Sequence, residues 1–77
     1  MPKQVIQYTA TAMYHKTDVE IDPYTSWTAI MAVDHDDALR QFGAMEARYI
    51  AESGSVRVLG SLELETWEAF TERVMAY

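Results

Sequence analysis

The 77-residue sequence contains no cysteine, 3 glycines and 2 prolines. Without cysteine the chain has no disulfides, no thiolate nucleophile and no cysteine metal site. A secreted domain of this size usually depends on such cross-links, so we expect a protein of the reducing cytoplasm.

Basic residues are also scarce, because 6 Lys and Arg stand against 12 Asp and Glu, which gives a net charge of −6. A chain with no basic cluster lacks the electrostatic footprint that dominates affinity for nucleic acids, and anionic lipid repels it. No apolar run approaches the roughly 20 residues that cross a bilayer, and the amino end does not lead into a signal-peptide hydrophobic region. We therefore expect no direct nucleic-acid ligand and no membrane association.

Motifs of catalysis and cofactor binding are absent as well. Neither a phosphate loop nor a dinucleotide fingerprint occurs, and the Ser-Gly-Ser segment at 53–55 is not a nucleophile elbow. His35 lies among aspartates, but no second histidine stands at a ligand spacing. The sequence therefore predicts no catalytic residue, no metal, no cofactor and no enzymatic activity.

What the sequence does contain is the composition of one folded domain, residues 1–77, with 49% hydrophobic and 23% charged residues. Apolar and polar residues alternate with the period of a strand over 5–16, 24–33 and 56–65, and 17–23 suits a turn. These patterns predict three strands, of which the first two form a hairpin.

Two helices complete the plan. Asp34 is typical of a helix N-cap, the apolar residues that follow recur at helical spacing to about Ser53, and Gly54 is typical of a helix stop. Thr66 is a second N-cap, before a short helix that runs toward Tyr77.

These elements predict an α+β fold of two layers. A three-stranded antiparallel sheet in the order 2-1-3 (ββαβα) would carry both helices on one face. The other face would then be uncovered, and its expected residues are Val5, Gln7, Thr9, Thr11, Met13, His15, Thr28, Ile30, Arg57 and Leu59.

The negative charge is concentrated in one stretch. Residues 17–37 hold six acids and no Lys or Arg, whereas the remaining residues sum to zero. The strand 24–33 separates two acidic groups, and the topology brings the second group close to the start of both helices. One interpretation is that these acids complement helix dipoles, and the other is an acidic docking surface. The candidate partner-binding residues are Asp18, Glu20, Asp22, Tyr24, Asp34, Asp36, Asp37, Glu63 and Glu65.

The order strand, strand, helix, strand in a short, acidic, cysteine-free chain resembles small phage or mobile-element proteins, among them anti-CRISPR inhibitors. The resemblance covers the plan from Val5 to Leu64 and includes the helix entered through 34–39. It implies a non-enzymatic inhibitor that occupies a surface on a larger host complex, and we expect a protein partner with a basic surface. The alternative is a structural or assembly module that acts as a homodimer or as a subunit of a larger particle.

Overall fold

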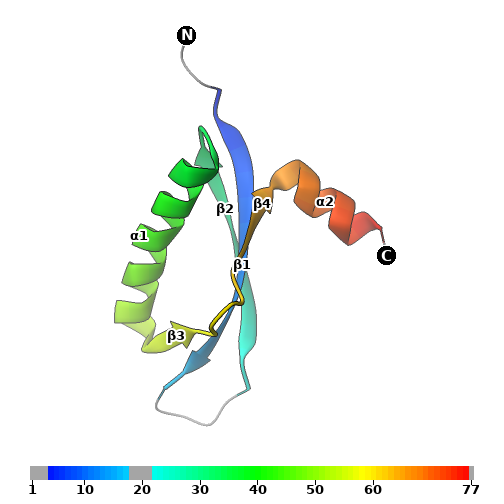
Figure 1. Cartoon of the computed structure of the whole chain (residues 1–77). Helices are drawn as coiled ribbons and strands as arrows, with labels where there is room; N and C mark the ends of the chain where they lie inside the picture. The colour runs from blue at the N-terminus through cyan, green and yellow to red at the C-terminus, as the bar shows by residue number, and fades with distance from the viewer. Residues whose placement is uncertain (1–3, 18–21, 77) are drawn as a thin grey trace.

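The computed structural model describes residues 4–17 and 22–76. The candidate residues Asp18 and Glu20 lie outside these ranges. In chain order the elements are β1 (Ile6–Lys16), β2 (Tyr24–Ala32), α1 (His35–Ser53), β3 (Ser55–Arg57), β4 (Glu63–Thr66) and α2 (Trp67–Met75) (Figure 1).

The long strand β1 lies at the centre of the sheet. β2 pairs with it antiparallel, from Ile6 opposite Ala32 to Tyr14 opposite Tyr24, while β3 and β4 share its other edge. The predicted α+β class and the antiparallel order 2-1-3 are confirmed, with β4 as an additional strand.

The prediction of one continuous strand over 56–65 was wrong. β3 pairs with the carboxyl end of β1, and β4 pairs with its residues 8–11. Between them the chain turns at Gly60, whose φ of 78° is a left-handed conformation that favours glycine. The Ser61 amide donates to the Val58 carbonyl at 3.1 Å across this turn. Leu59 is therefore fully exposed in a loop and does not lie on the sheet face where we expected it.

The predicted helix signals are confirmed. The Asp34 carboxylate accepts a 2.8 Å hydrogen bond from the Asp37 amide at the start of α1. Gly54 ends that helix in the left-handed region with a φ of 71°. The Thr66 hydroxyl accepts from the Ala69 amide at 3.1 Å and begins α2.

The prediction for the two faces of β2 was wrong. Ile30 lies opposite Tyr8, and residues directly opposite each other share a face, so Ile30 is buried beneath α1 together with Ala32. Trp27 and Met31 point to the other face and are 59% and 55% exposed. Both faces of β2 carry apolar residues, so alternation alone did not identify the inner one.

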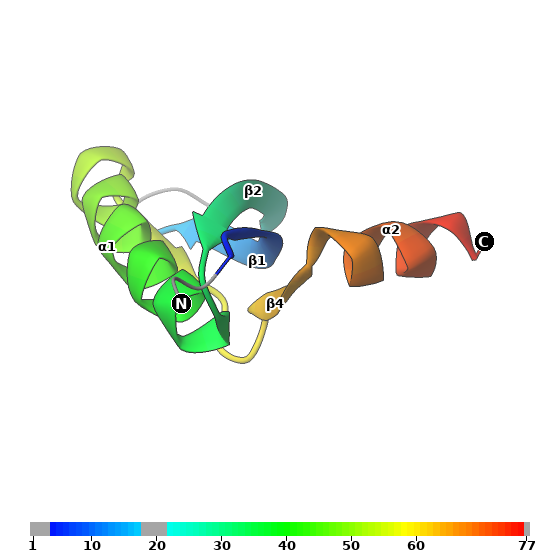
Figure 2. The same cartoon turned by 90° about the horizontal axis from the view of Figure 1, so that it is seen from above.

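The two helices do not cover the same face. α1 packs its buried Ala38 and Phe42 against the side of the sheet that holds Tyr8 and Tyr14. α2 lies on the opposite side, where Phe70 stacks on Trp27, and Figure 2 shows the sheet between them. The expectation that both helices share one layer was therefore wrong, because the chain passes from β4 into α2 on the side away from α1.

Candidate protein-binding surfaces

The acids at the start of α1 are mostly engaged with their own helix. Asp34 caps the first turn, and the Asp37 carboxylate accepts from the Val33 amide at 3.1 Å and pairs with Arg40. Asp36 is exposed. Helix capping therefore accounts for the positions of Asp34 and Asp37, and Asp36 is the acid of this group most open to a partner.

Glu63 and Glu65 lie on the face of the sheet opposite α1, because they stand opposite Thr11 and Thr9 of β1. Arg73 of α2 pairs with both, at 3.5 Å from Glu63 and 2.6 Å from Glu65. The structure thus separates these two glutamates from the aspartates of α1, and their charge is partly compensated within the chain.

The remaining described candidates lie at the start of β2. Asp22 is exposed. The Tyr24 hydroxyl is hydrogen-bonded to the Tyr49 hydroxyl and lies 3.2 Å from the Ser55 hydroxyl. The hydrogen bonds to Ser55 and Tyr49 lower the pKa of Tyr24, and the bond to Tyr24 raises the pKa of Tyr49. Tyr24 itself is half-buried.

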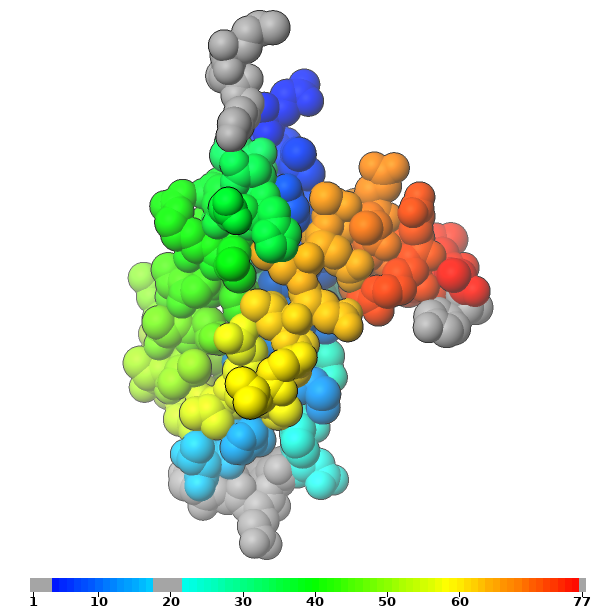
Figure 3. Space-filling model, viewed as in Figure 1, coloured from blue at the N-terminus to red at the C-terminus, as the bar shows by residue number. Residues whose placement is uncertain are grey.

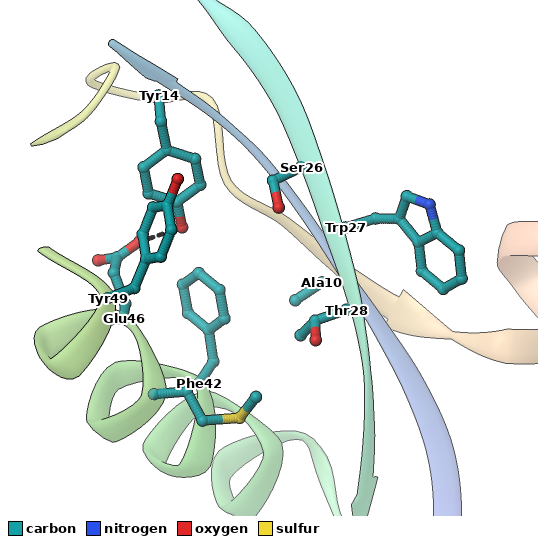
Figure 4. Close-up of a pocket in the computed structure, with 9 residues that line it drawn as sticks. Ala10, Tyr14, Ser26, Trp27, Thr28, Phe42, Glu46 and Tyr49 are labelled. Atoms are coloured by element: carbon teal, nitrogen blue, oxygen red, sulfur yellow. Dashed lines mark hydrogen bonds between the residues drawn. The ribbon is translucent and has the colours of Figure 1, made fainter. Parts of the chain in front are cut away.

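A pocket of about 200 Å³ opens between α1 and β2 (Figure 4). Its α1 wall holds Phe42, Met45 and Tyr49, and Ser26 and Thr28 of β2 form the opposite side. The side chain of Trp27 points away from this space. We call this pocket the α1–β2 groove. These three residues of α1 are spaced by three and four positions, which places them on one helix face.

A hydrogen-bond network lies at one end of the α1–β2 groove. The Tyr14 hydroxyl donates to Oε2 of Glu46 at 2.7 Å, and Nε of Arg57 lies 3.6 Å from the same oxygen. Burial and the Glu46 carboxylate both raise the pKa of Tyr14. Tyr14 therefore keeps its proton at neutral pH and serves as a hydrogen-bond donor.

Arg57 also corrects a prediction. It stands opposite Tyr14 in the sheet and so faces α1, not the uncovered side, and its guanidinium lies 5.7 Å from the centre of the Phe42 ring. The cation therefore stabilises the α1 side of the sheet and is not free on an open surface.

The opposite face of the sheet exposes a set of large apolar side chains. Trp27 stacks on Phe70 at 6.3 Å, and Phe70 stacks on Trp67 at 5.6 Å. Trp67 is 40% exposed and Val74 is 50% exposed, and α2 has no buried residue. We call Trp27, Met31, Trp67, Phe70 and Val74 the apolar face. In Figure 3 α2 projects from one side of the molecule.

Under this face, two buried polar atoms of the described residues have no partner. Within the described part of the chain, the buried hydroxyl oxygens of Thr9 and Thr11 make no hydrogen bond. Across residues 4–17 and 22–76 no group of three or more metal-ligating side chains comes together. None of the helices in those ranges is both long and apolar enough to cross a membrane.

Comparison with known proteins adds no relative. No family model matches the chain, and neither a curated protein nor a solved structure matches it.

Proposed function

We propose that this chain is a non-enzymatic protein-binding module that docks on a larger partner with a basic surface. The observation that carries the proposal is the α1–β2 groove, an apolar pocket beside a strand with acids at both of its ends. Asp22 precedes β2, and three aspartates follow it at 34, 36 and 37. From Asp22 to Leu39 the sequence has no Lys or Arg.

Such a distribution suits a partner that presents an apolar side chain among basic ones. The apolar side chain would displace water from the space beside Phe42 and Tyr49, which is where binding energy concentrates in protein interfaces. The aspartates would steer the basic partner toward the groove and make the association rate fall as salt rises.

The finer part of the proposal is that the chain is a phage-type inhibitor of the anti-CRISPR kind, which blocks a larger complex in the host cytoplasm by covering part of its surface. Its small size, its acidic character and its strand-strand-helix-strand order support this. A domain that acts by occupancy requires a surface and no catalytic group.

The test uses the tagged protein to capture partners from bacterial lysate at low and at moderate salt, followed by affinity measurement on the purified partner. Asp34 and Asp37 hold the helix, so the informative variant is the double substitution Asp22→Lys and Asp36→Lys, at two exposed positions. We expect at least a tenfold loss of affinity at low salt. Glu72→Lys, at an exposed position on α2, is the matched control and should bind like the wild type. If the double variant also binds like the wild type, the acidic docking surface is wrong.

A second candidate function is a structural or assembly module, either a homodimer or a subunit of a larger particle. The observation that favours it is the apolar face, because a soluble monomer seldom leaves two tryptophans and a neighbouring methionine this exposed. Light scattering at high micromolar concentration tests the homodimer form of this candidate, since a monomer at that concentration would contradict it.

A further inference from the structure

The outer edge of β2 has a defined hydrogen-bonding pattern. The N–H and C=O of one residue in a strand point to the same side, and successive residues alternate. The Met31 carbonyl accepts a 3.0 Å hydrogen bond from Nε2 of Gln41, so the backbone N–H and C=O of Met31 point away from β1. The backbone groups of Thr25, Trp27 and Ala29 therefore also point outward.

An independent contact gives the same assignment. The Met13 carbonyl accepts a hydrogen bond from the Val58 amide at 2.8 Å. The backbone N–H and C=O groups of the odd-numbered residues of β1 therefore point toward β3 and β4. The even-numbered residues of β1 must then bond with the even-numbered residues of β2 that lie opposite them. Among the residues described, no strand pairs with the outer edge of β2.

This edge lacks most of the features that normally prevent pairing with another chain. Monomeric proteins protect an edge strand with charges, a proline, a bulge, a very short length or a covering helix or loop, and here α1 reaches the edge through Gln41 at Met31. β2 is nine residues long, its pairing with β1 runs without a bulge, and it contains no Asp, Glu, Lys, Arg or Pro. An uncharged edge matters because each copy carries a net charge of −6 and two copies otherwise repel each other.

We propose that a second copy of this chain adds its β2 antiparallel to this edge, with a two-fold axis at Trp27. Trp27 then pairs with Trp27 of the copy, and Thr25 pairs with Ala29 of the copy. In this register every outward N–H and C=O of Thr25, Trp27 and Ala29 finds a partner. The proposal goes beyond the docking function, because it uses the strand edge rather than the acids.

The ends of the paired strands support this register. Met31 comes to stand opposite Pro23 of the copy, and proline has no N–H to donate. The Met31 carbonyl needs none, because Gln41 already donates to it. Neither chain leaves a backbone donor or acceptor unpaired at this position.

Charge favours this register over the neighbouring one, in which the two-fold axis lies at Thr28. With the axis at Trp27, Asp22 stands opposite Ala32 of the copy. With the axis at Thr28, it would stand opposite Asp34 of the copy, and like charges directly opposite each other are unfavourable. The register at Trp27 also places the two exposed Trp27 rings side by side on the face away from α1, as an aromatic cross-strand pair.

The first experiment measures molar mass by light scattering at 200–500 μM, a range chosen as roughly the concentration at which even a weak dimer of about 10⁻⁵ M dissociation constant is populated. We expect the wild type at twice the mass of the chain. Trp27→Lys should fall to the mass of one chain, because it opposes two like charges across the axis. Leu59→Lys makes the same charge change in the exposed loop and should remain a dimer. A monomeric wild type, or a dimeric Trp27→Lys, overturns the proposal.

The second experiment tests the register by disulfide formation, which is specific because the chain has no cysteine of its own. Ser26 stands opposite Thr28 of the copy in a non-hydrogen-bonded pair, where Cα atoms lie about 4.5 Å apart and a disulfide fits. A mixture of Ser26→Cys and Thr28→Cys should therefore cross-link several times faster under mild oxidation than either variant alone. Equal rates would rule out this register.

The two proposals fail separately. A monomer that still binds its basic partner through Asp22 and Asp36 would remove the dimer and leave the docking function. A dimer whose partner affinity is unchanged by substitution of those two acids would leave the dimer and remove the docking function. Circular dichroism of each variant confirms that the fold is retained.

Discussion

The hydroxyl of Tyr14 donates a 2.7 Å hydrogen bond to the carboxylate of Glu46, and this contact joins the central strand to α1. Tyr14 is 4% exposed. Arg57 reaches the same carboxylate oxygen from β3. One carboxylate thus connects three elements that lie far apart in the sequence.

Removing the Tyr14 hydroxyl should lower the stability of the folded state. Tyr14→Phe takes away a hydrogen bond to a carboxylate that is itself largely buried, so we expect the free energy of unfolding to fall by about 2 kcal/mol. Urea denaturation measures the change. Tyr24→Phe is the matched control, because its hydroxyl lies in a more exposed pair, and its loss should be clearly smaller. Equal losses of unfolding free energy in the two variants would show that the Tyr14–Glu46 hydrogen bond contributes no more to stability than the contacts of the Tyr24 hydroxyl.

The same pair predicts a dependence on alkaline pH. Burial and Glu46 raise the pKa of Tyr14 above its ordinary value near 10, so the folded state holds this proton more tightly than the unfolded state. The stabilisation is complete below pH 10 and is lost as the pH rises above it. The stability advantage of the wild type over Tyr14→Phe should therefore be constant from pH 8 to about pH 9 and shrink as the pH rises from about 10 to 11 in urea titrations. An advantage that stays constant over this range would contradict the assignment.

Two aspartates of similar sequence context should behave differently. Asp34→Ala removes the N-cap of α1 and should lower the free energy of unfolding by about 1 kcal/mol. Asp36→Ala removes an exposed charge and should change stability by less than about 0.5 kcal/mol. Thermal unfolding followed by circular dichroism compares them. If both variants lose the same stability, capping does not explain the position of Asp34.

Thr9 offers a stabilising substitution. Its side chain is fully buried, and within residues 4–17 and 22–76 its hydroxyl oxygen has no hydrogen-bond partner. Valine has nearly the same shape and no polar atom to desolvate, so Thr9→Val should raise the free energy of unfolding by about 1 kcal/mol. Chemical denaturation tests this against Thr25→Val, which replaces an exposed threonine on the same sheet and should have little effect. A loss of stability in Thr9→Val would mean that the hydroxyl is satisfied in solution.

The elements were predictable from sequence because their signals are local. Alternation marked β1, and the caps at Asp34, Gly54 and Thr66 marked the helix ends within a residue. The faces of β2 were not predictable in this way. Trp27 and Met31 are as apolar as Ile30 and Ala32, and the register with β1 decided which pair lies inward.

The candidate surfaces were only partly predictable for the same reason. The acidic stretch is visible in the sequence, but the capping bonds that engage Asp34 and Asp37 depend on backbone geometry. The α1–β2 groove forms between residues distant in the chain, such as Thr28 and Tyr49. The apolar face depends on α2 passing to the other side of the sheet, which no local pattern specifies.

The central position of β1 also has a consequence for the order of events during synthesis. β1 and β2 can form a hairpin as soon as both have left the ribosome, but the second edge of β1 stays open until residues 55–66 follow. Pairing between segments so far apart is slow to form, and an open central strand attracts other chains meanwhile. A nascent chain stalled before β4 would therefore expose the strand that the finished protein protects best.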